Sequence, residues 1–168
     1  MTGARAPRPE AGHSYRQSLV ATHRLVGEMP AQKHEFGCGA ACVACVTHSS
    51  YCDVVRDLGI QRARTRGFYC RELVESLHRR GYQYEYRHIK PALRRIVYEP
   101  GVIVFIRRSR RYPAGHYVVR TGRGWADPWI NMPRNRRISA AEAGVRLRLP
   151  GLPQYALFPV SLPSIKKS

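Results

Sequence analysis

The chain has 168 residues, a hydrophobic content of 43% and a formal net charge of +18. This length suits one domain with its own hydrophobic core, and the hydrophobic content excludes wholesale disorder. The longest aliphatic or aromatic run, residues 102–106, is far too short to cross a bilayer. We therefore expect a soluble globular protein without a transmembrane segment.

Basic residues outnumber acidic ones by 29 to 11, and short arginine clusters are spread along the chain. Such a surface attracts nucleic acid or an acidic protein through forces that weaken with salt, but interleaved charge is also common on solvated surfaces.

The five cysteines are an odd number, and residues 1–30 lack the apolar core of a secretory signal. This pattern predicts reduced thiols and a cytoplasmic location.

Three segments are predicted along the chain. Residues 1–29 form a basic N-terminal arm, residues 30–163 the folded domain and residues 164–168 a basic tail. The first boundary lies at Met29-Pro30, because a residue that precedes proline avoids the helical region. Within the arm, the apolar spacing of residues 15–28 predicts a short helix.

Helices are expected in the first half of the domain. The apolar segment from Cys38 to about residue 48 predicts a buried helix. A second helix is expected at residues 51–59, after serine N-caps and up to a stop at Gly59. A loop with three arginines follows, and the clearest helix of the chain is predicted at residues 68–81.

The second half of the chain predicts extended structure. Tyr82, Tyr84 and Tyr86 alternate with polar residues, which is the period of a half-buried strand. Further strands are expected at residues 101–106, 116–120, 125–128 and 155–160, and short helices at residues 90–97 and 139–145. A tight turn at residues 121–124 joins two of these strands. Helices followed by antiparallel strands predict an α+β domain.

The candidate nucleophile is Cys38, in the segment QKHEFGCGAACVAC at residues 32–45. A thiol acts as a nucleophile in its thiolate form, which the free N–H groups and positive dipole end of a helix N-terminus stabilise. Gly37 and Gly39 flank Cys38 and allow a sharp turn and the close approach of a substrate backbone. The base that this nucleophile needs must come from another part of the chain.

The strongest candidate for that base is His116, which opens a predicted strand directly after Gly115. A general base needs a third group that orients it. Asp127 lies across the predicted hairpin and is the only carboxylate between Glu99 and Glu142. The two pairing strands are expected to bring His116 and Asp127 to one end of the sheet.

Together these residues resemble the C39 family of papain-like cysteine peptidases, the double-glycine leader peptidases. The resemblance covers residues 30–130 and rests on Gln32 ahead of Cys38-Gly39, the Ala-rich helix, His116-Tyr-Val-Val and Asp127-Pro128. It implies a papain-like fold, in which an N-terminal helical half packs on a C-terminal antiparallel sheet. The implied catalytic residues are Cys38 as nucleophile, His116 as base and acid, Asp127 as its orienter and Gln32 as oxyanion donor.

The resemblance further implies a peptide or protein substrate that is cleaved after small residues, such as a Gly-Gly leader, and chemistry that needs no cofactor. Related papain-like folds also catalyse deamidation and transpeptidation through the same thioester. Such peptidases are often fused to the membrane and ATPase parts of a peptide exporter. We therefore expect a cytoplasmic enzyme that acts beside a transporter or within a larger assembly. The sequence departs from the family at Gly37, where an acidic residue is common.

The expected substrate contacts are the glycines beside the catalytic candidates and the two tryptophans beside Asp127, namely Gly39, Gly115, Trp125 and Trp129. The tryptophans flank Asp127-Pro128, where they are predicted either to wall a substrate cleft or to pack in the core. The glycines are expected to let a substrate backbone approach closely.

The cysteines allow two other interpretations. Cys38, Cys42 and Cys45 have the C-x3-C-x2-C spacing of an iron–sulfur ligand set, and Cys42, Cys45, His48 and Cys52 are residue types that bind zinc. Because the first three share one face of an apolar helix, we favour buried packing residues over a metal site for Cys42 and Cys45.

A second hypothesis for the whole protein is not enzymatic. It is a basic module that keeps a papain-like scaffold and binds nucleic acid or docks in a large assembly. Its support is the net charge of +18, the arginine-rich loop at residues 107–111 close to His116, and the basic arm.

Overall fold

The computed structural model describes residues 26–132 and 134–160. Within them the helices come first, α2 (Cys38–Thr47), α3 (Tyr51–Leu58), α4 (Ile60–Thr65) and α5 (Cys70–Arg79). The strands that follow are β1 (Tyr84–His88), β2 (Ile103–Ile106), β3 (His116–Arg120), β4 (Trp125–Asp127), β5 (Gly144–Arg146) and β6 (Pro153–Pro159). Short 3₁₀ helices are η1 (Pro91–Leu93), η2 (Ile96–Tyr98) and η3 (Ile138–Ala140).

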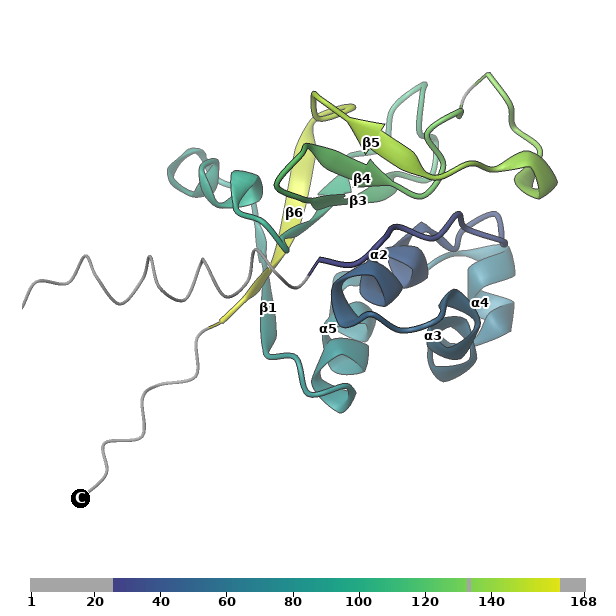
Figure 1. Ribbon diagram of the computed structural model, residues 1–168. Helices are drawn as coiled ribbons and strands as arrows, with labels where there is room; N and C mark the ends of the chain where they lie inside the picture. Colours follow the sequence, from purple (N-terminus) through teal and green to yellow (C-terminus); the bar gives the residue numbers. More distant parts are fainter. Residues whose placement is uncertain (1–25, 133, 161–168) are drawn as a thin grey trace, which may run out of the picture.

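The strands form an antiparallel sheet in the order β1-β6-β2-β3-β4-β5. Figure 1 shows the helices gathered on one side of this sheet, with α2 against it. The predicted α+β class is confirmed, with an N-terminal helical half packed on a C-terminal antiparallel sheet. In the part of the chain that the structure describes, no helix has the length and hydropathy of a bilayer-spanning segment.

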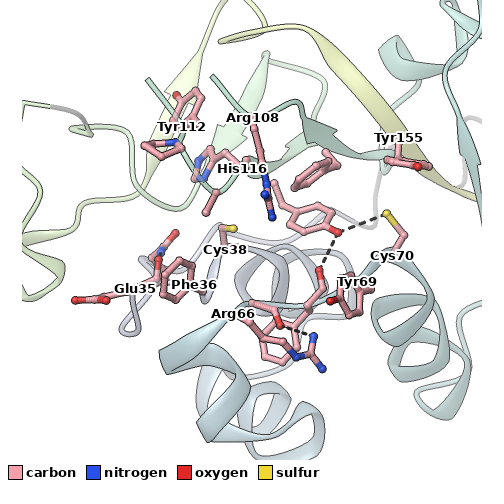
Figure 2. Close-up of a pocket in the computed structure, with 18 of the residues that line it drawn as sticks. Glu35, Phe36, Cys38, Arg66, Tyr69, Cys70, Arg108, Tyr112, His116 and Tyr155 are labelled. Carbon is pink, nitrogen blue, oxygen red and sulfur yellow. Dashed lines mark hydrogen bonds between the residues drawn. The ribbon is translucent and has the colours of Figure 1, made fainter. Parts of the chain in front are cut away.

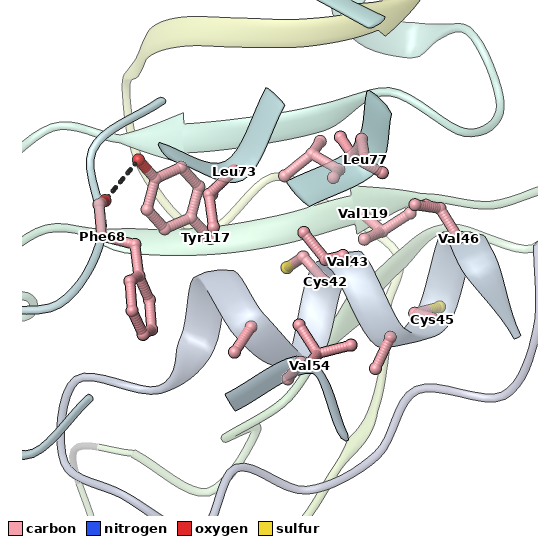
Figure 3. Packing of buried hydrophobic residues seen from close by; sticks show 14 of the residues in the cluster. Cys42, Val43, Cys45, Val46, Val54, Phe68, Leu73, Leu77, Tyr117 and Val119 are labelled. Atoms are coloured by element: carbon pink, nitrogen blue, oxygen red, sulfur yellow. Dashed lines mark hydrogen bonds between the residues drawn. The ribbon is translucent and has the colours of Figure 1, made fainter. Parts of the chain in front are cut away.

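Two buried clusters cover the two faces of the sheet. Along β3, Tyr117 and Val119 belong to the cluster shared with the helices, whereas Val118 between them belongs to the other cluster. This alternation is expected of a strand with both faces covered. Helix α2 is buried from Gly39 to Thr47, and Figure 3 shows its packing against the sheet and the other helices. A helix that is apolar all round is thereby held in a fixed position, with its N-terminus at the site described below.

Gly39 brings the first turn of α2 close to its neighbours. A Cβ at this position would lie 3.0 Å from Leu73 of α5 and 3.3 Å from Tyr117 of β3, which is tighter than ordinary contact. The lack of a side chain therefore lets α2 approach both elements, and Gly39 has a role in packing.

The segment before α2 is tied to the domain by backbone contacts. The Gly27 N–H donates to the Cys45 carbonyl at 2.9 Å, and the Cys45 thiol donates to the Gly27 carbonyl at 3.2 Å. The Gln32 N–H donates to the Pro128 carbonyl at 3.1 Å, which links this segment to the end of β4. Residues 26–29, the described part of the predicted arm, thus lie against the folded domain.

Helices α2, α3 and α5 begin and end close to their predicted limits. Ser50 caps α3 by accepting the Asp53 N–H at 3.1 Å. The prediction of a loop at residues 60–66 was wrong, because residues 60–65 form α4. Gly59, with a φ of 106°, turns the chain directly from α3 into α4, and Ala63 of α4 is fully buried.

Three predictions for the second half were wrong in part. Of the alternating tyrosines only Tyr84 is buried, because β1 is an edge strand, and Tyr86 is 41% exposed. Residues 90–97 form parts of η1 and η2 rather than one helix, and residues 139–145, predicted as a helix, lead into strand β5, which pairs with β4. The helix predicted at residues 15–28 lies outside the described residues except for 26–28, which are not helical.

Candidate active site

Cys38 is the first residue of α2, and no side chain caps this helix end. The N–H groups of the first turn therefore have no side-chain acceptor, and they present the positive end of the helix dipole to the thiol. Cys38 is partly exposed and lines a cavity with a mostly apolar wall. Its thiol is thus accessible to a ligand in that cavity.

Gly37 precedes Cys38, and the Tyr51 side chain fills the space that a side chain at position 37 would need. A Cβ on Gly37 would overlap the Tyr51 hydroxyl. That hydroxyl is hydrogen-bonded to His34 Nδ1 at 3.0 Å, and the two rings stack. Burial raises the pKa of Tyr51 to about 12, so the phenol is neutral. A neutral phenol from α3 therefore stands where the resemblance led us to expect an acidic side chain.

Replacement of Gly37 by alanine tests this contact. We expect Gly37→Ala to destabilise the fold by about 1–3 kcal/mol, because the added methyl group overpacks against the Tyr51 hydroxyl. In a Tyr51→Phe background the same change should cost less, since the hydroxyl is gone. Urea unfolding of the four proteins of this double-mutant cycle measures the difference. Equal costs in the two backgrounds would contradict the contact.

His116 begins β3 and Asp127 ends β4, and their side chains form a buried pair with exposures of 2% and 0%. His116 Nε2 donates to Asp127 Oδ1 at 2.8 Å. The same oxygen accepts the Trp129 N–H at 2.8 Å, and Asp127 Oδ2 accepts Arg146 Nε at 2.6 Å. Nδ1 of His116 is not engaged by Asp127, and Cys38 is close enough to the imidazole to help raise its pKa. Cys38 and the His116–Asp127 pair thus lie at one site, where Cys38 and His116 line the same cavity.

The protonation of this pair follows from its partners. Burial lowers the pKa of His116, but the hydrogen bond to Asp127, the nearby Cys38 and the charges of those groups outweigh burial and raise the pKa to about 9. Burial raises the pKa of Asp127, but hydrogen bonds from His116, Arg146 and Trp129 and the His116 charge bring it down to about 2. At neutral pH the pair is therefore imidazolium and carboxylate. An imidazolium beside a thiol stabilises the thiolate.

The cavity at this site has a volume of about 470 Å³ and lies between the helical half and the sheet. Figure 2 shows Cys38 and His116 facing it from the helix and from the sheet. Tyr112 stacks on the His116 ring with centroids 4.7 Å apart and an angle of 7° between the planes, and so covers one face of the imidazole. Much of the remaining wall is aromatic, with Phe36, Phe68, Tyr69, Phe105, Tyr117 and Tyr155 among its residues.

Gln32 lines the same cavity and is 2% exposed. Its Nε2 donates to the carbonyls of His34 at 3.0 Å and Glu35 at 3.1 Å, and its Oε1 is buried without a hydrogen-bond partner among the described residues. These two carbonyls engage both N–H groups of the amide unless they share one of them, in which case the second N–H is left for a ligand. The predicted oxyanion role of Gln32 depends on that second N–H.

The predicted substrate contacts divide into two groups. Gly115 and Trp129 line the cavity, and a Cβ on Gly115, whose φ is 79°, would overlap the Phe105 ring. Gly39 and Trp125 lie outside it. Trp125 is 1% exposed in the cluster on the far face of the sheet, where its ring meets the Tyr98 ring edge-on at 5.8 Å. Gly39 and Trp125 therefore have packing roles rather than the predicted substrate contacts.

Two residues of the site were missed from the sequence. Arg146 bonds Asp127 from strand β5, in a segment whose start was predicted as a helix. The alternation of apolar and basic residues at 145–149, VRLRL, is the signal that could have identified this strand. Tyr112 follows a run of arginines and carries no comparable signal.

The remaining cysteines do not gather around a common centre. Burial raises the pKa of both Cys42 and Cys45, that of Cys45 to about 12. Cys52 is exposed, and the Cys70 sulfur lies 3.4 Å from the Tyr117 hydroxyl. All five cysteines are free thiols. Within residues 26–132 and 134–160 no group of three or more His, Cys, Asp or Glu side chains is placed to hold a metal ion. Cys42 and Cys45 are fully buried in the core cluster, where they pack.

The fold matches that of a peptidase domain of known structure. Among solved structures the chain is similar to the peptidase domain of Streptococcus ComA, a bifunctional ABC transporter involved in a quorum-sensing pathway. The TM-score is 0.52 and the sequence identity 16%, over 80% of this chain and 98% of that chain. This similarity establishes a shared fold. No family model matches the sequence, and no curated protein matches it either.

Proposed function

We propose that this protein is a cysteine peptidase in which Cys38 is the nucleophile, His116 the base and acid, and Asp127 the orienting carboxylate. The observation that carries the proposal is the buried His116–Asp127 pair, whose imidazole lines the same cavity as Cys38, the first residue of the uncapped helix α2. The cavity beside the thiol is the second support, because its mostly apolar wall offers a substrate a binding site next to Cys38.

The residues define each step of the reaction. The Cys38 thiolate attacks the carbonyl carbon of the scissile bond, and the developing oxyanion meets the Cys38 N–H and the Gln32 amide. Each such donor is worth ~3 kcal/mol of transition-state stabilisation. His116 gives its proton to the departing amine, which leaves an acyl thioester on Cys38. His116 then takes a proton from water, whose oxygen attacks the thioester and releases the acid and the Cys38 thiolate, which restores the thiolate beside the imidazolium.

The substrate is a peptide or protein in this proposal. The similarity to a peptidase domain supports that class, and cleavage after small residues such as Gly-Gly is carried over from the resemblance in sequence. Deamidation and transpeptidation use the same thioester and differ in the amide attacked or in the final acceptor. Mass analysis of the products separates these three outcomes.

Incubation with a broad mixture of peptides tests the proposed reaction over many candidate cleavage sequences at once. New peptide termini, identified by mass spectrometry, are expected with the wild type and not with Cys38→Ala. The matched control is Cys70→Ala, since Cys70 lines the same cavity and should be dispensable. Termini that appear equally with Cys38→Ala, or with neither protein, would refute the proposed peptidase.

The arginines that line the cavity affect which peptide sequences the site would prefer as substrates. Arg66 and Arg71 line it but pair with Glu72 and Glu75. Arg108 reaches toward the cavity from the sheet side in Figure 2, and no ion pair engages it among the described residues. An arginine in this position attracts a carboxylate. We therefore expect a preference for peptides with an acidic side chain near the scissile bond.

Reversal of the Arg108 charge tests this preference. We expect Arg108→Glu to raise KM about tenfold for a peptide with Glu near the scissile bond, the effect of one lost charge-assisted hydrogen bond, and to lower KM for the matched peptide with Lys. Arg110→Glu is the control, because it makes the same charge change in the same loop outside the cavity lining. Identical shifts in both variants would show a general charge effect instead of a contact.

A further inference from the structure

Arg146 is held at both ends of its guanidinium group. Its Nε donates to Asp127 Oδ2 at 2.6 Å, and its Nη2 donates to the Ile130 carbonyl at 2.6 Å. Arg146 pairs with Trp125 across β4 and β5, and Gly144 pairs with Asp127, so Arg146 and Asp127 are diagonal neighbours. The strand register therefore places the guanidinium beside the carboxylate.

The contacts of Asp127 divide between its two oxygens. Oδ1 takes the His116 Nε2–H and the Trp129 N–H, whereas Oδ2 takes Arg146 Nε. Of these three donors, the Arg146 guanidinium is the one that keeps its positive charge at every pH of interest. Two cations, the His116 imidazolium and Arg146, thus share one fully buried carboxylate.

Arg146 also forms part of the boundary of the site. Its side chain is 17% exposed and lines a second cavity, of about 730 Å³, together with Arg111, Arg134 and Arg148. Asp127 is fully buried. Arg146 therefore lies between this carboxylate and the solvent of the second cavity.

We propose that Arg146 is a positioning residue of the site, which acts through Asp127 and limits how strongly that carboxylate holds the imidazolium proton of His116. This inference rests on the proposed function. A group that both takes and gives a proton works best when neither form is held too firmly. With Arg146 absent, the full Asp127 charge would act on His116 alone, and His116 would release its proton to the leaving amine less readily.

The direction of the change follows from the charges. Trp129 N–H still holds Oδ1 of Asp127 when Arg146 is removed, so the His116–Asp127 bond persists without the competing cation. The pKa of His116, about 9 in the wild type, should then rise by roughly one pH unit. The cleavage rate at pH 7 should fall at least about tenfold, as is usual when the group that orients a reactive residue is lost.

The experiment is a titration of the His116 imidazole by NMR, together with cleavage rates, in four proteins. Arg146→Met is expected to raise the His116 midpoint. Arg146→Lys keeps the positive charge but lacks the planar guanidinium group with its several N–H donors. The His116 midpoint in this variant should therefore stay near that of the wild type, and its cleavage rate should lie above that of Arg146→Met. Arg148→Met, which lines the same second cavity away from Asp127, is the matched control and should leave both unchanged.

An unmoved or lowered His116 midpoint in Arg146→Met would overturn the inference, as would a raised midpoint in Arg148→Met. The titration reads the imidazole directly and needs no substrate. If the wild type cleaves no peptide, only the proposed function is refuted. The His116 titration midpoints still decide whether Arg146 acts on His116 through Asp127.

Discussion

The His116→Ala variant is expected to cleave peptides on the order of 10⁴-fold more slowly than the wild type. Without the imidazole, Cys38 loses the cation that stabilises its thiolate, and the leaving amine loses its proton donor. Cys38→Ala should cause a similar loss. Because these residues act as a unit, the double variant should be no slower than either single variant. Initial rates with one cleaved peptide measure all three.

His88→Ala is the control for this result. His88 is an exposed residue of β1 that does not line the cavity, although its ring meets that of the cavity residue Tyr155 edge-on. We expect its cleavage rate to match the wild type. A His116→Ala variant whose rate stays within about tenfold of the wild type would exclude His116 as the general base.

Asp127→Ala is expected to lower the free energy of unfolding at pH 7 by about 3–5 kcal/mol. The change leaves the His116 imidazolium and the Arg146 guanidinium without their buried counter-charge. Addition of Arg146→Met removes one of the two unpaired cations, so the double variant should regain part of the loss. Urea unfolding measures these two variants against the wild type.

Asp57→Ala is the matched control, since Asp57 also pairs with two arginines but is 27% exposed. Pairs that are screened by solvent are worth at most about 1 kcal/mol. The two aspartates therefore separate a buried ion pair from a surface one. Equal losses at Asp57 and Asp127 would contradict a special role for the buried carboxylate.

The stability that Asp127→Ala removes should also depend on pH. The folded pKa of His116 is raised, so its contribution is fully present below the ordinary value of 6.5 and is lost as pH rises toward about 9. The folded pKa of Asp127 is lowered, so its contribution is present above the ordinary value of 3.8 and is lost as pH falls toward about 2. The difference between wild type and Asp127→Ala should therefore be largest between pH 3.8 and 6.5.

The candidate catalytic residues could be found from the sequence because each lies at the end of a strongly patterned element. Cys38 starts a segment that is apolar on every side, and such a segment must be buried. His116 and Asp127 lie at matching ends of a hairpin, and an antiparallel register places those ends side by side. Local pattern and chain order thus place these three residues, while their catalytic roles came from the family resemblance and stay a prediction.

The rest of the site depends on contacts between distant segments. The residues of α4 are mostly polar, and its buried residue, Ala63, packs in the core cluster, a contact that the local sequence does not reveal. Trp125 and Trp129 are close in sequence, but the sheet register turns Trp125 to the far face while Trp129 lines the cavity. Arg146 was missed because its role depends on the pairing of β4 with β5, which no local pattern specifies.

The most direct test of the central claim is the rate at which iodoacetamide alkylates Cys38 at pH 6. Ordinary thiols, with a pKa of ~8.5, are almost fully protonated at that pH. A thiolate–imidazolium pair predicts that Cys38 reacts at least about tenfold faster than the exposed Cys52 of the same molecule, and that His116→Ala abolishes the difference. Equal rates at Cys38 and Cys52 in the wild type would contradict the peptidase and favour a papain-like domain that binds without catalysis.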